Sequence, residues 1–150
     1  MLQIFLRVSL LSLTLCTGVI FHSTVFARSD TDATLPVTDI SFHEVRRNKE
    51  NMTDLQWEEY AKSIKGKRIR WSGYVEEVKS KFFGGYQVLV DMDPPHDKMS
   101  VQDVYLDKVT KEQALSLEKD NPIEFEGTIS SAISVLGSLQ ISLKDVKIIQ

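Results

Sequence analysis

The sequence predicts a mainly β domain: a small five-stranded barrel with one helix ahead of it and a second helix between the third and fourth strands. Three observations lead to this prediction. Most of the chain after residue 67 alternates apolar and polar side chains with a period of two, as half-buried strands do. Two segments instead show helical spacing behind a capping-box motif. The two patterns follow one another as helix, three strands, helix, two strands.

The first helix is expected to begin after Thr53. The segment TDLQ is a capping box, in which Thr53 caps the helix and the side chain of Gln56 reaches back to it. Gly66 is expected to end the helix. Apolar residues at spacings of three and four form one stripe, which consists of Trp57, Tyr60, Ala61 and Ile64.

The strands are expected at residues 69–78, 86–92, 101–106, 123–133 and 139–149. Trp71 shares a face with Ile69 in the first strand, so its indole is predicted to fill the core. The apolar positions shift after Gly73, which predicts a β-bulge at that glycine. The second helix is expected within residues 110–119. It opens with another capping box, and Asn121-Pro122 follows it.

Five strands with a helix between the third and the fourth are the order of the oligonucleotide/oligosaccharide-binding (OB) barrel. The first and fourth strands are long and interrupted by glycine, which suits a small barrel whose strands bend sharply. We therefore expect an OB-fold domain over residues 51–150. Residues 28–50 are expected to be a polar tail, whose sparse apolar residues could dock against the domain. These are Leu35, Val37, Ile40 and Phe42.

Residues 1–27 are predicted to be a signal peptide that is cleaved after Ala27. Arg7 gives a positive start, an apolar stretch follows, and Val25 and Ala27 stand where signal peptidase reads small side chains. The apolar stretch could span a bilayer by length, but its serine, threonine and histidine residues argue against a retained span. The sequence therefore predicts a periplasmic or secreted protein.

Cys16 raises the alternative of a lipoprotein, which Leu15 disfavours because that processing requires a small residue before the cysteine. Cys16 is the only cysteine, so the mature chain would have no disulfide bond. All 21 acidic residues and 17 of the 18 basic ones follow Ala27, so the mature chain carries an excess of negative charge. A domain that binds by neutralising phosphates should be basic, so nucleic acid is not the expected partner.

Several segments within residues 53–149 resemble exported bacterial OB-fold domains of the tRNA-anticodon-binding-like family. The shared pattern is a helix that ends in Gly-Lys, then Trp-x-Gly-x-Val, an acidic second strand, and a closing Gly-x-Leu followed by Asp-Val. The segments are LQWEEYAKSIKGKRIRWSGYVEEV, VQDVYLD, IEFEGTI and LGSLQISLKDVKI. The resemblance implies an OB fold. It implies no catalytic residues and no cofactor, and the family name does not imply tRNA binding.

The predicted contact surface is an apolar, aromatic end of the barrel. OB domains bind through the loops that follow the first and fourth strands, and exposed apolar clusters in loops mark contact sites. The residues predicted to bind a ligand or partner are Phe82, Phe83, Tyr86, Tyr105, Ile133, Val135 and Leu136. Packing against the tail or against a second copy explains the phenylalanines equally well. The sequence thus favours a non-catalytic interaction module whose partner is a protein, a glycan, a cell-envelope component or a second copy of itself.

Five carboxylates suggest a calcium site, because hard cations take several oxygen ligands. They are Asp91, Asp93, Asp97, Asp103 and Asp107. An EF-hand loop would need glycine and glutamate where His96 and Gln102 stand, so we interpret the segment as a solvated loop and expect no metal. The mature chain keeps two histidines, His43 and His96, and both are expected at the surface.

Two alternative functions stay open. A metal-dependent phosphodiester hydrolase would use Asp91, Asp93 and Arg70, and it requires these side chains to converge in one exposed pocket. A single-stranded nucleic-acid binder would use the basic segment KSIKGKRIR beside the aromatic residues. No enzyme activity is expected, because the mature chain lacks a cysteine nucleophile and has no Gly-x-Ser-x-Gly motif.

Overall fold

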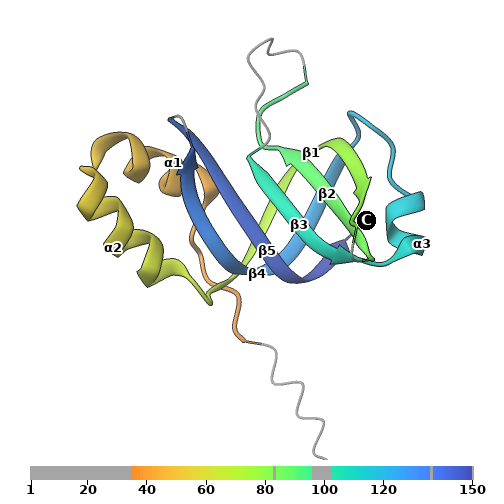
Figure 1. The fold of residues 1–150 in the computed structure, drawn as a ribbon, viewed down its shortest axis with the longest axis horizontal. Helices are drawn as coiled ribbons and strands as arrows, with labels where there is room; N and C mark the ends of the chain where they lie inside the picture. Colours follow the sequence, from red (N-terminus) through yellow and green to blue (C-terminus); the bar gives the residue numbers. More distant parts are fainter. Residues whose placement is uncertain (1–34, 83, 96–102, 136, 150) are drawn as a thin grey trace, which may run out of the picture. The chain divides into compact units, whose positions relative to one another are not determined.

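A computed structural model describes residues 35–82, 84–95, 103–135 and 137–149. Five strands close into a barrel in the order β1-β2-β3-β5-β4 (Figure 1). Neighbouring strands are antiparallel except for β3 and β5, which are parallel. The strands are β1 (Arg68–Ser80), β2 (Tyr86–Asp91), β3 (Val104–Val109), β4 (Pro122–Val135) and β5 (Ser138–Ile149). The predicted OB fold is confirmed.

The helices are α1 (Phe42–Asn51), α2 (Asp54–Ile64) and α3 (Lys111–Leu115). Both predicted capping boxes are present, at Thr53 for α2 and at Thr110 for α3. Helix α3 lies between β3 and β4 as expected but is shorter than predicted. Its C-cap, Ser116, already donates its N–H to the carbonyls of Glu112 and Gln113.

Helix α1 lies within the segment that the sequence predicts to be a polar tail. Ser41 caps it by accepting the N–H of Glu44, and Phe42 and Val45 are buried in the domain core. The ring of Phe42 packs edge-on against Trp71 with 5.5 Å between centroids. These residues are therefore part of the folded domain. Only two α1 residues are buried, too few for helical periodicity to stand out in the sequence.

The barrel interior is apolar and draws on all five strands. Trp71 is buried as predicted, and its indole N–H donates to the carbonyl of Ile40 at 2.7 Å. A buried tryptophan normally satisfies its N–H in this way. The fully buried side chains include Ile69, Val75, Val88, Val90, Val104, Leu106, Phe125, Ile129, Ile141 and Leu143.

The predicted bulge at Gly73 is wrong. Gly73 pairs in regular register with Ile123 of β4, and the irregularity in β1 falls between Val75 and Glu77. Glycine is needed at position 73 for space: a Cβ there would lie 2.6 Å from Cγ1 of Val90 and 2.7 Å from the carbonyl oxygen of Asp91. The apolar shift in the sequence therefore reflects a bulge that begins two residues later.

The predicted signal peptide, residues 1–27, lies outside the described residues. Within the part of the chain that the structure describes, no helix has both the length and the apolar character needed to cross a membrane.

Candidate binding groove

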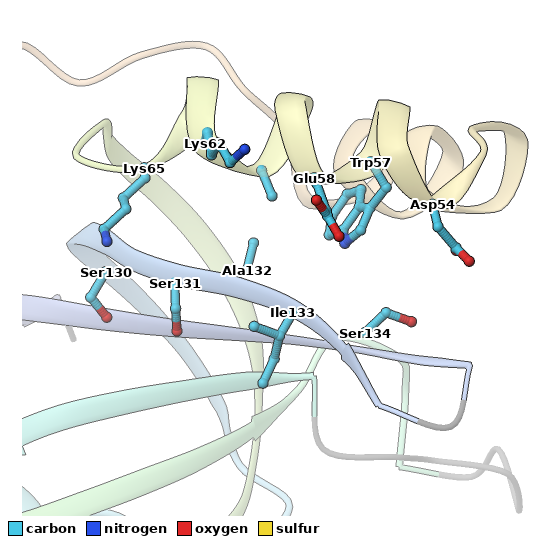
Figure 2. Close-up of a pocket in the computed structure, with 11 residues that line it drawn as sticks. Asp54, Trp57, Glu58, Lys62, Lys65, Ser130, Ser131, Ala132, Ile133 and Ser134 are labelled. Carbon is cyan, nitrogen blue, oxygen red and sulfur yellow. The ribbon is translucent and has the colours of Figure 1, made fainter.

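A groove of about 620 Å³ runs between α2 and the second half of β4 (Figure 2). Helix α2 provides one wall, with Trp57 and Ala61, and residues 130–134 of β4 form the floor. The side chain of Ala132 points from β4 toward α2 (Figure 2). The size lies within the range of ligand sites in proteins, and the lining mixes apolar with polar groups as such sites do.

The floor of the groove is a strand edge that no other strand covers within the described part of the chain. Strand β1 pairs with β4 only as far as Arg68 opposite Thr128. One residue further, the N–H of Gly66 donates to the carbonyl of Ile129 at 2.8 Å, and the N–H of Ile129 donates to the carbonyl of Lys67 at 2.9 Å. Gly66 has a φ of 83° and lies in the turn that connects the end of α2 to the start of β1. Among the described residues, the β4 segment 130–135 therefore pairs with β5 alone.

The hairpin between β4 and β5 determines which backbone groups face the groove. Val135 pairs with Ser138, and the closing pair of so tight a hairpin is hydrogen-bonded. Hydrogen-bonded and non-hydrogen-bonded pairs alternate along antiparallel strands. Ile133 therefore bonds to β5, whereas Ala132 and Ser134 turn their N–H and C=O groups to the open edge. Such groups are a template for a further strand.

The two ends of the groove carry opposite charges. Lys62 and Lys65 lie toward the Ser130 end, and Asp54 and Glu58 lie toward the Ser134 end (Figure 2). Lys62 already binds the carboxylate of Glu59 at 2.7 Å. Lys65 has no ion pair among the residues that the structure describes, so its ammonium is available to an anionic group of a ligand.

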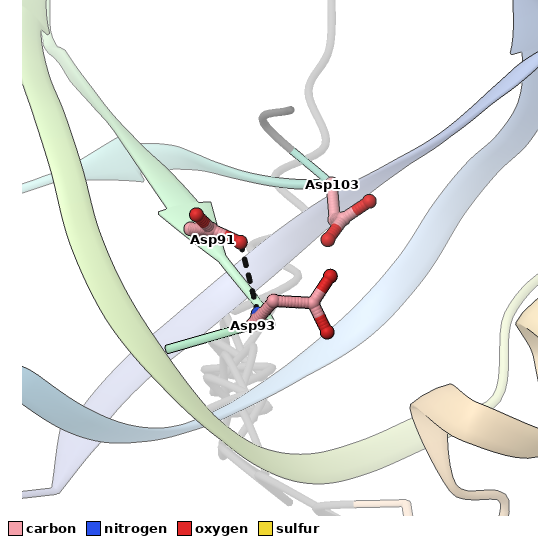
Figure 3. A group of neighbouring side chains, drawn as sticks. All are labelled: Asp91, Asp93 and Asp103. Carbon is pink, nitrogen blue, oxygen red and sulfur yellow. Dashed lines mark hydrogen bonds between the residues drawn. The ribbon is translucent and has the colours of Figure 1, made fainter. Parts of the chain in front are cut away.

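A second polar cluster lies where β2 ends and β3 begins. Carboxylate oxygens of Asp91, Asp93 and Asp103 come within 4.8 Å of one another (Figure 3). Arg46 of α1 binds both oxygens of Asp93 at 3.0 and 2.9 Å and one oxygen of Asp103 at 2.9 Å. The guanidinium thus supplies the positive charge of the cluster and ties α1 to the barrel.

Burial dominates the electrostatics of this cluster. Asp91 is 2% exposed and Asp103 is 7% exposed, so the interpretation of these carboxylates as a solvated loop is wrong for both. Burial raises the pKa of Asp103 to about 6, although the charge of Arg46 opposes the shift. Burial also raises the pKa of Asp91. Asp97 lies outside the described residues.

Asp107 and Arg70, which the sequence suggested as a cation ligand and a phosphate contact, lie away from this cluster. Asp107 lies at the opposite end of β3, where it accepts hydrogen bonds from Lys81 and Gln87. Arg70 binds both carboxylate oxygens of Glu124 at 2.7 and 2.9 Å. Asp91 pairs with Tyr74, four residues further along β1, and Asp93 binds Arg46, so the arrangement of Asp91, Asp93 and Arg70 that a hydrolase would need is not formed.

The structure does not bring the predicted aromatic and apolar loop residues together at one barrel end. Strands β1, β3 and β5 all run in the same direction, because β2 is antiparallel to both β1 and β3 while β5 is parallel to β3. The turn after β1, with Phe82, therefore lies at the opposite end of the barrel from the turn before β5. Tyr86, opposite Val109 of β3, belongs to the Phe82 end.

Of the remaining predicted contact residues, Ile133 and Val135 are exposed in β4, and Ile133 lines the groove. Tyr105 is half-buried on β3, opposite Leu89. Phe83 and Leu136 lie outside the described residues. Of the predicted contact residues that the structure describes, the groove thus includes only Ile133.

Sequence reasoning missed most of the groove because its wall was assigned to the core. Trp57 and Ala61 belong to the apolar stripe of α2, and that stripe both packs on the barrel and faces the groove. The sequence carried no signal of the open edge, because the register that leaves residues 130–135 of β4 beyond the start of β1 is visible only in the structure.

No known protein family matches the chain, and no curated protein sequence matches it. Among solved structures, the chain is similar to a lipoprotein of Klebsiella pneumoniae that is provisionally described as nucleic-acid-binding. The TM-score is 0.51 at 15% identity, over 79% of this chain and 94% of that one. The mitochondrial single-stranded DNA-binding protein Rim1 of S. cerevisiae aligns with a TM-score of 0.30 at 12% identity, over 55% of this chain and 93% of that one.

The first of these likenesses shows a shared OB-type fold, and the second is too weak to carry an argument. The class of protein that fold and groove define is an OB-fold protein with a candidate binding groove. The resemblance to the tRNA-anticodon-binding-like family stays a prediction, as does export.

Proposed function

We propose that this protein is an exported, non-catalytic binding module that holds a polypeptide partner in the groove between α2 and β4. The observation that carries the proposal is the open backbone edge of β4 on the floor of that groove. Unpaired backbone donors and acceptors beside a partly apolar wall suit a polypeptide, which offers complementary backbone groups. The N-terminal sequence supports export.

The charge of the outer barrel face disfavours nucleic acid. Nucleic-acid-binding OB folds use the face of strands β2 and β3. Here Val88, Val90, Val104 and Leu106 point into the barrel, and the alternate positions hold Gln87, Leu89, Tyr105 and the carboxylates of Asp91, Asp103 and Asp107. Asp91 and Asp103 are buried and Asp107 binds the ammonium of Lys81, so none of these positions supplies a cation for a phosphate. A phosphate backbone would find no positive charge at these positions, and the chain after Ala27 carries an excess of acidic residues, so the affinity for nucleic acid should be low.

A peptide-display selection tests the proposal. The protein, expressed from its full-length sequence, is immobilised and offered a random linear peptide library. Selected peptides are then compared on two variants that each add one arginine. Ala61→Arg places it in the groove wall, whereas Leu115→Arg places it on exposed α3. We expect the peptides to bind the parent and Leu115→Arg with similar affinity and to bind Ala61→Arg at least tenfold more weakly. Circular dichroism should show that both variants are folded.

Two results would contradict the proposal. Peptides that bind Ala61→Arg as well as the parent would place the site elsewhere. A fluorescein-labelled oligothymidine that binds at low salt, weakens steeply as salt rises and is insensitive to Ala61→Arg would favour the nucleic-acid alternative instead.

A further inference from the structure

We propose that the groove binds an extended segment that adds as a strand to the open edge of β4, runs antiparallel to it, and directs an acidic group toward Lys65. This inference rests on the proposed function and specifies the conformation, direction and charge of the partner. The pairing groups would be the N–H and C=O of Ala132 and Ser134, which face away from β5. Strand addition of this kind gives affinity through the backbone and leaves the choice of partner to its side chains.

The direction follows from the place that the segment would fill. In the barrel, β1 is the antiparallel neighbour of β4 and begins at Arg68, opposite Thr128. A segment beside residues 130–134 would occupy the line of β1, extended backward beyond its first residue. If the segment runs antiparallel to β4, its last residue would lie near Gly66, the turn through which the chain passes from α2 into β1. Antiparallel pairs are also slightly more stable per residue than parallel ones.

The charge of the segment follows from the ends of the groove. An antiparallel segment enters beside Asp54 and Glu58 and finishes beside Lys65 and Lys62. Basic groups are therefore favoured near its start, and an acidic side chain or a terminal carboxylate near its end. Lys65 is the cation to test, because Lys62 is already paired with Glu59. The β4 segment 130–134 at about 3.3 Å per residue spans roughly 17 Å, which suits a segment of about five residues.

The wall above the segment would give side-chain contacts on one face only. Trp57 and Ala61 face the floor from α2, whereas the side chain of Ile133, which is 48% exposed, points to the other face of β4 (Figure 2). Successive side chains of a strand point to opposite faces, so alternate residues of the bound segment would meet α2 while the others would lie on the outer face beside Ile133. We therefore expect an alternating apolar pattern in the segment.

Two substitutions at one exposed position separate strand addition from other modes of binding. Ser134→Pro removes the N–H that faces the groove, whereas Ser134→Ala removes only the hydroxyl. Proline is tolerated at strand edges where its missing N–H would face outward, so both variants are expected to fold. The probe is a peptide selected by display on the parent. We expect Ser134→Pro to weaken its binding at least tenfold and Ser134→Ala to change it less than twofold.

Amide hydrogen exchange gives an independent readout on the parent protein. The amides of Ala132 and Ser134 should exchange rapidly in the free protein and be protected when the peptide binds. The amide of Ile133, which bonds to β5, should be protected in both states. Equal effects of the two Ser134 substitutions, without new protection at Ala132 and Ser134, would overturn strand addition while leaving the groove as a binding site.

The charge of the segment is tested by reversal. Lys65→Glu should weaken the binding of a peptide with an acidic end several-fold at low salt. Replacing the acidic residue of the peptide with lysine should restore binding to this variant. Lys111→Glu, which changes an exposed lysine on α3, is the matched control. A selection that enriches no peptide at all sinks the proposed function. The oligomeric state is measured by light scattering. If the parent is a dimer and Ser134→Pro is a monomer, the occupant of the edge is a second copy of this chain and the proposal of a foreign partner is wrong.

Discussion

Arg46 and Asp93 form a two-point ion pair that links helix α1 to the end of strand β2, with both guanidinium Nη atoms bound to carboxylate oxygens at 3.0 and 2.9 Å. The same guanidinium reaches Asp103 at 2.9 Å and lies over the ring of Phe42, 4.8 Å from its centroid. The planar guanidinium of arginine can bind both oxygens of a carboxylate at once, which the ammonium of lysine does less well. One side chain therefore connects α1, the core aromatic residues and both strands next to the acidic cluster.

The first prediction concerns the pH dependence of stability. The pKa of Asp103 is raised to about 6 in the folded state, and an unfolded aspartate titrates near 3.9. Between these values the folded state binds more protons than the unfolded state. The stabilising contribution of protonated Asp103 is therefore fully present below about pH 4 and is lost as the pH rises through about 6. A shift of this size corresponds to about 2–3 kcal/mol in the free energy of unfolding.

Asp103→Asn tests this prediction, because it keeps the shape of the side chain and removes the titration. Arg46, Asp91 and Asp93 face the substituted group and stay in both proteins. Urea unfolding across pH 4 to 7 should show that the parent loses stability relative to the variant as pH rises. If the two free-energy profiles stay parallel over this range, Asp103 does not titrate with a raised pKa.

The second prediction concerns α1 as a part of the domain. Phe42→Ala removes a ring that is 3% exposed and packs against Trp71, so it should destabilise the protein by about 3 kcal/mol. His43→Ala changes the next residue of the same helix, which is exposed, and should cost less than about 0.5 kcal/mol. Thermal or urea unfolding measures both. Equal, small effects would mean that α1 does not contribute to the folded core in solution.

The sequence predicted those features that local patterns determine. Strand alternation, the capping boxes at Thr53 and Thr110 and the burial of Trp71 each depend on neighbours in sequence, and each is confirmed. Helix α1 was missed because its stability comes from the barrel: only Phe42 and Val45 are buried, and tertiary packing rather than periodicity makes it a helix.

The candidate site depends on contacts between distant segments, which a single sequence does not display. Asp91 and Asp103 are twelve residues apart in the sequence, and they meet because Val90 pairs with Val104. Arg46 comes from another element altogether. The predicted apolar end is not formed for a topological reason: the parallel pairing of β3 with β5 places the two loops that were predicted to bind a partner at opposite ends of the barrel.

The third prediction concerns the close contact at Gly73. A Cβ at this position would lie 2.6 Å from Val90 and 2.7 Å from the backbone oxygen of Asp91, so one strand must move. Gly73→Ala should cost about 1–3 kcal/mol, as overpacking of a core does. Ser72→Ala, at the neighbouring exposed position, should be nearly neutral. Comparable unfolding midpoints for the two variants would show that the barrel absorbs a methyl group here without strain.

The last prediction separates the two ends of the barrel by function. Phe82 is 95% exposed in the turn after β1, and Ile133 is 48% exposed in the groove at the other end. Binding of a display-selected peptide should therefore weaken several-fold in Ile133→Ser and stay within twofold of the parent in Phe82→Ser, as measured by isothermal titration calorimetry.

The same pair of variants distinguishes the groove from the aromatic loop that the sequence first suggested. Neither side chain belongs to the buried core cluster, so both proteins should unfold within about 1 kcal/mol of the parent, and a loss of binding then reports on contact rather than on folding. Loss of peptide binding in Phe82→Ser with full binding in Ile133→Ser would move the site to the turn after β1. In that case the open edge of β4 would need another explanation, of which pairing with a second copy is the first to examine by light scattering.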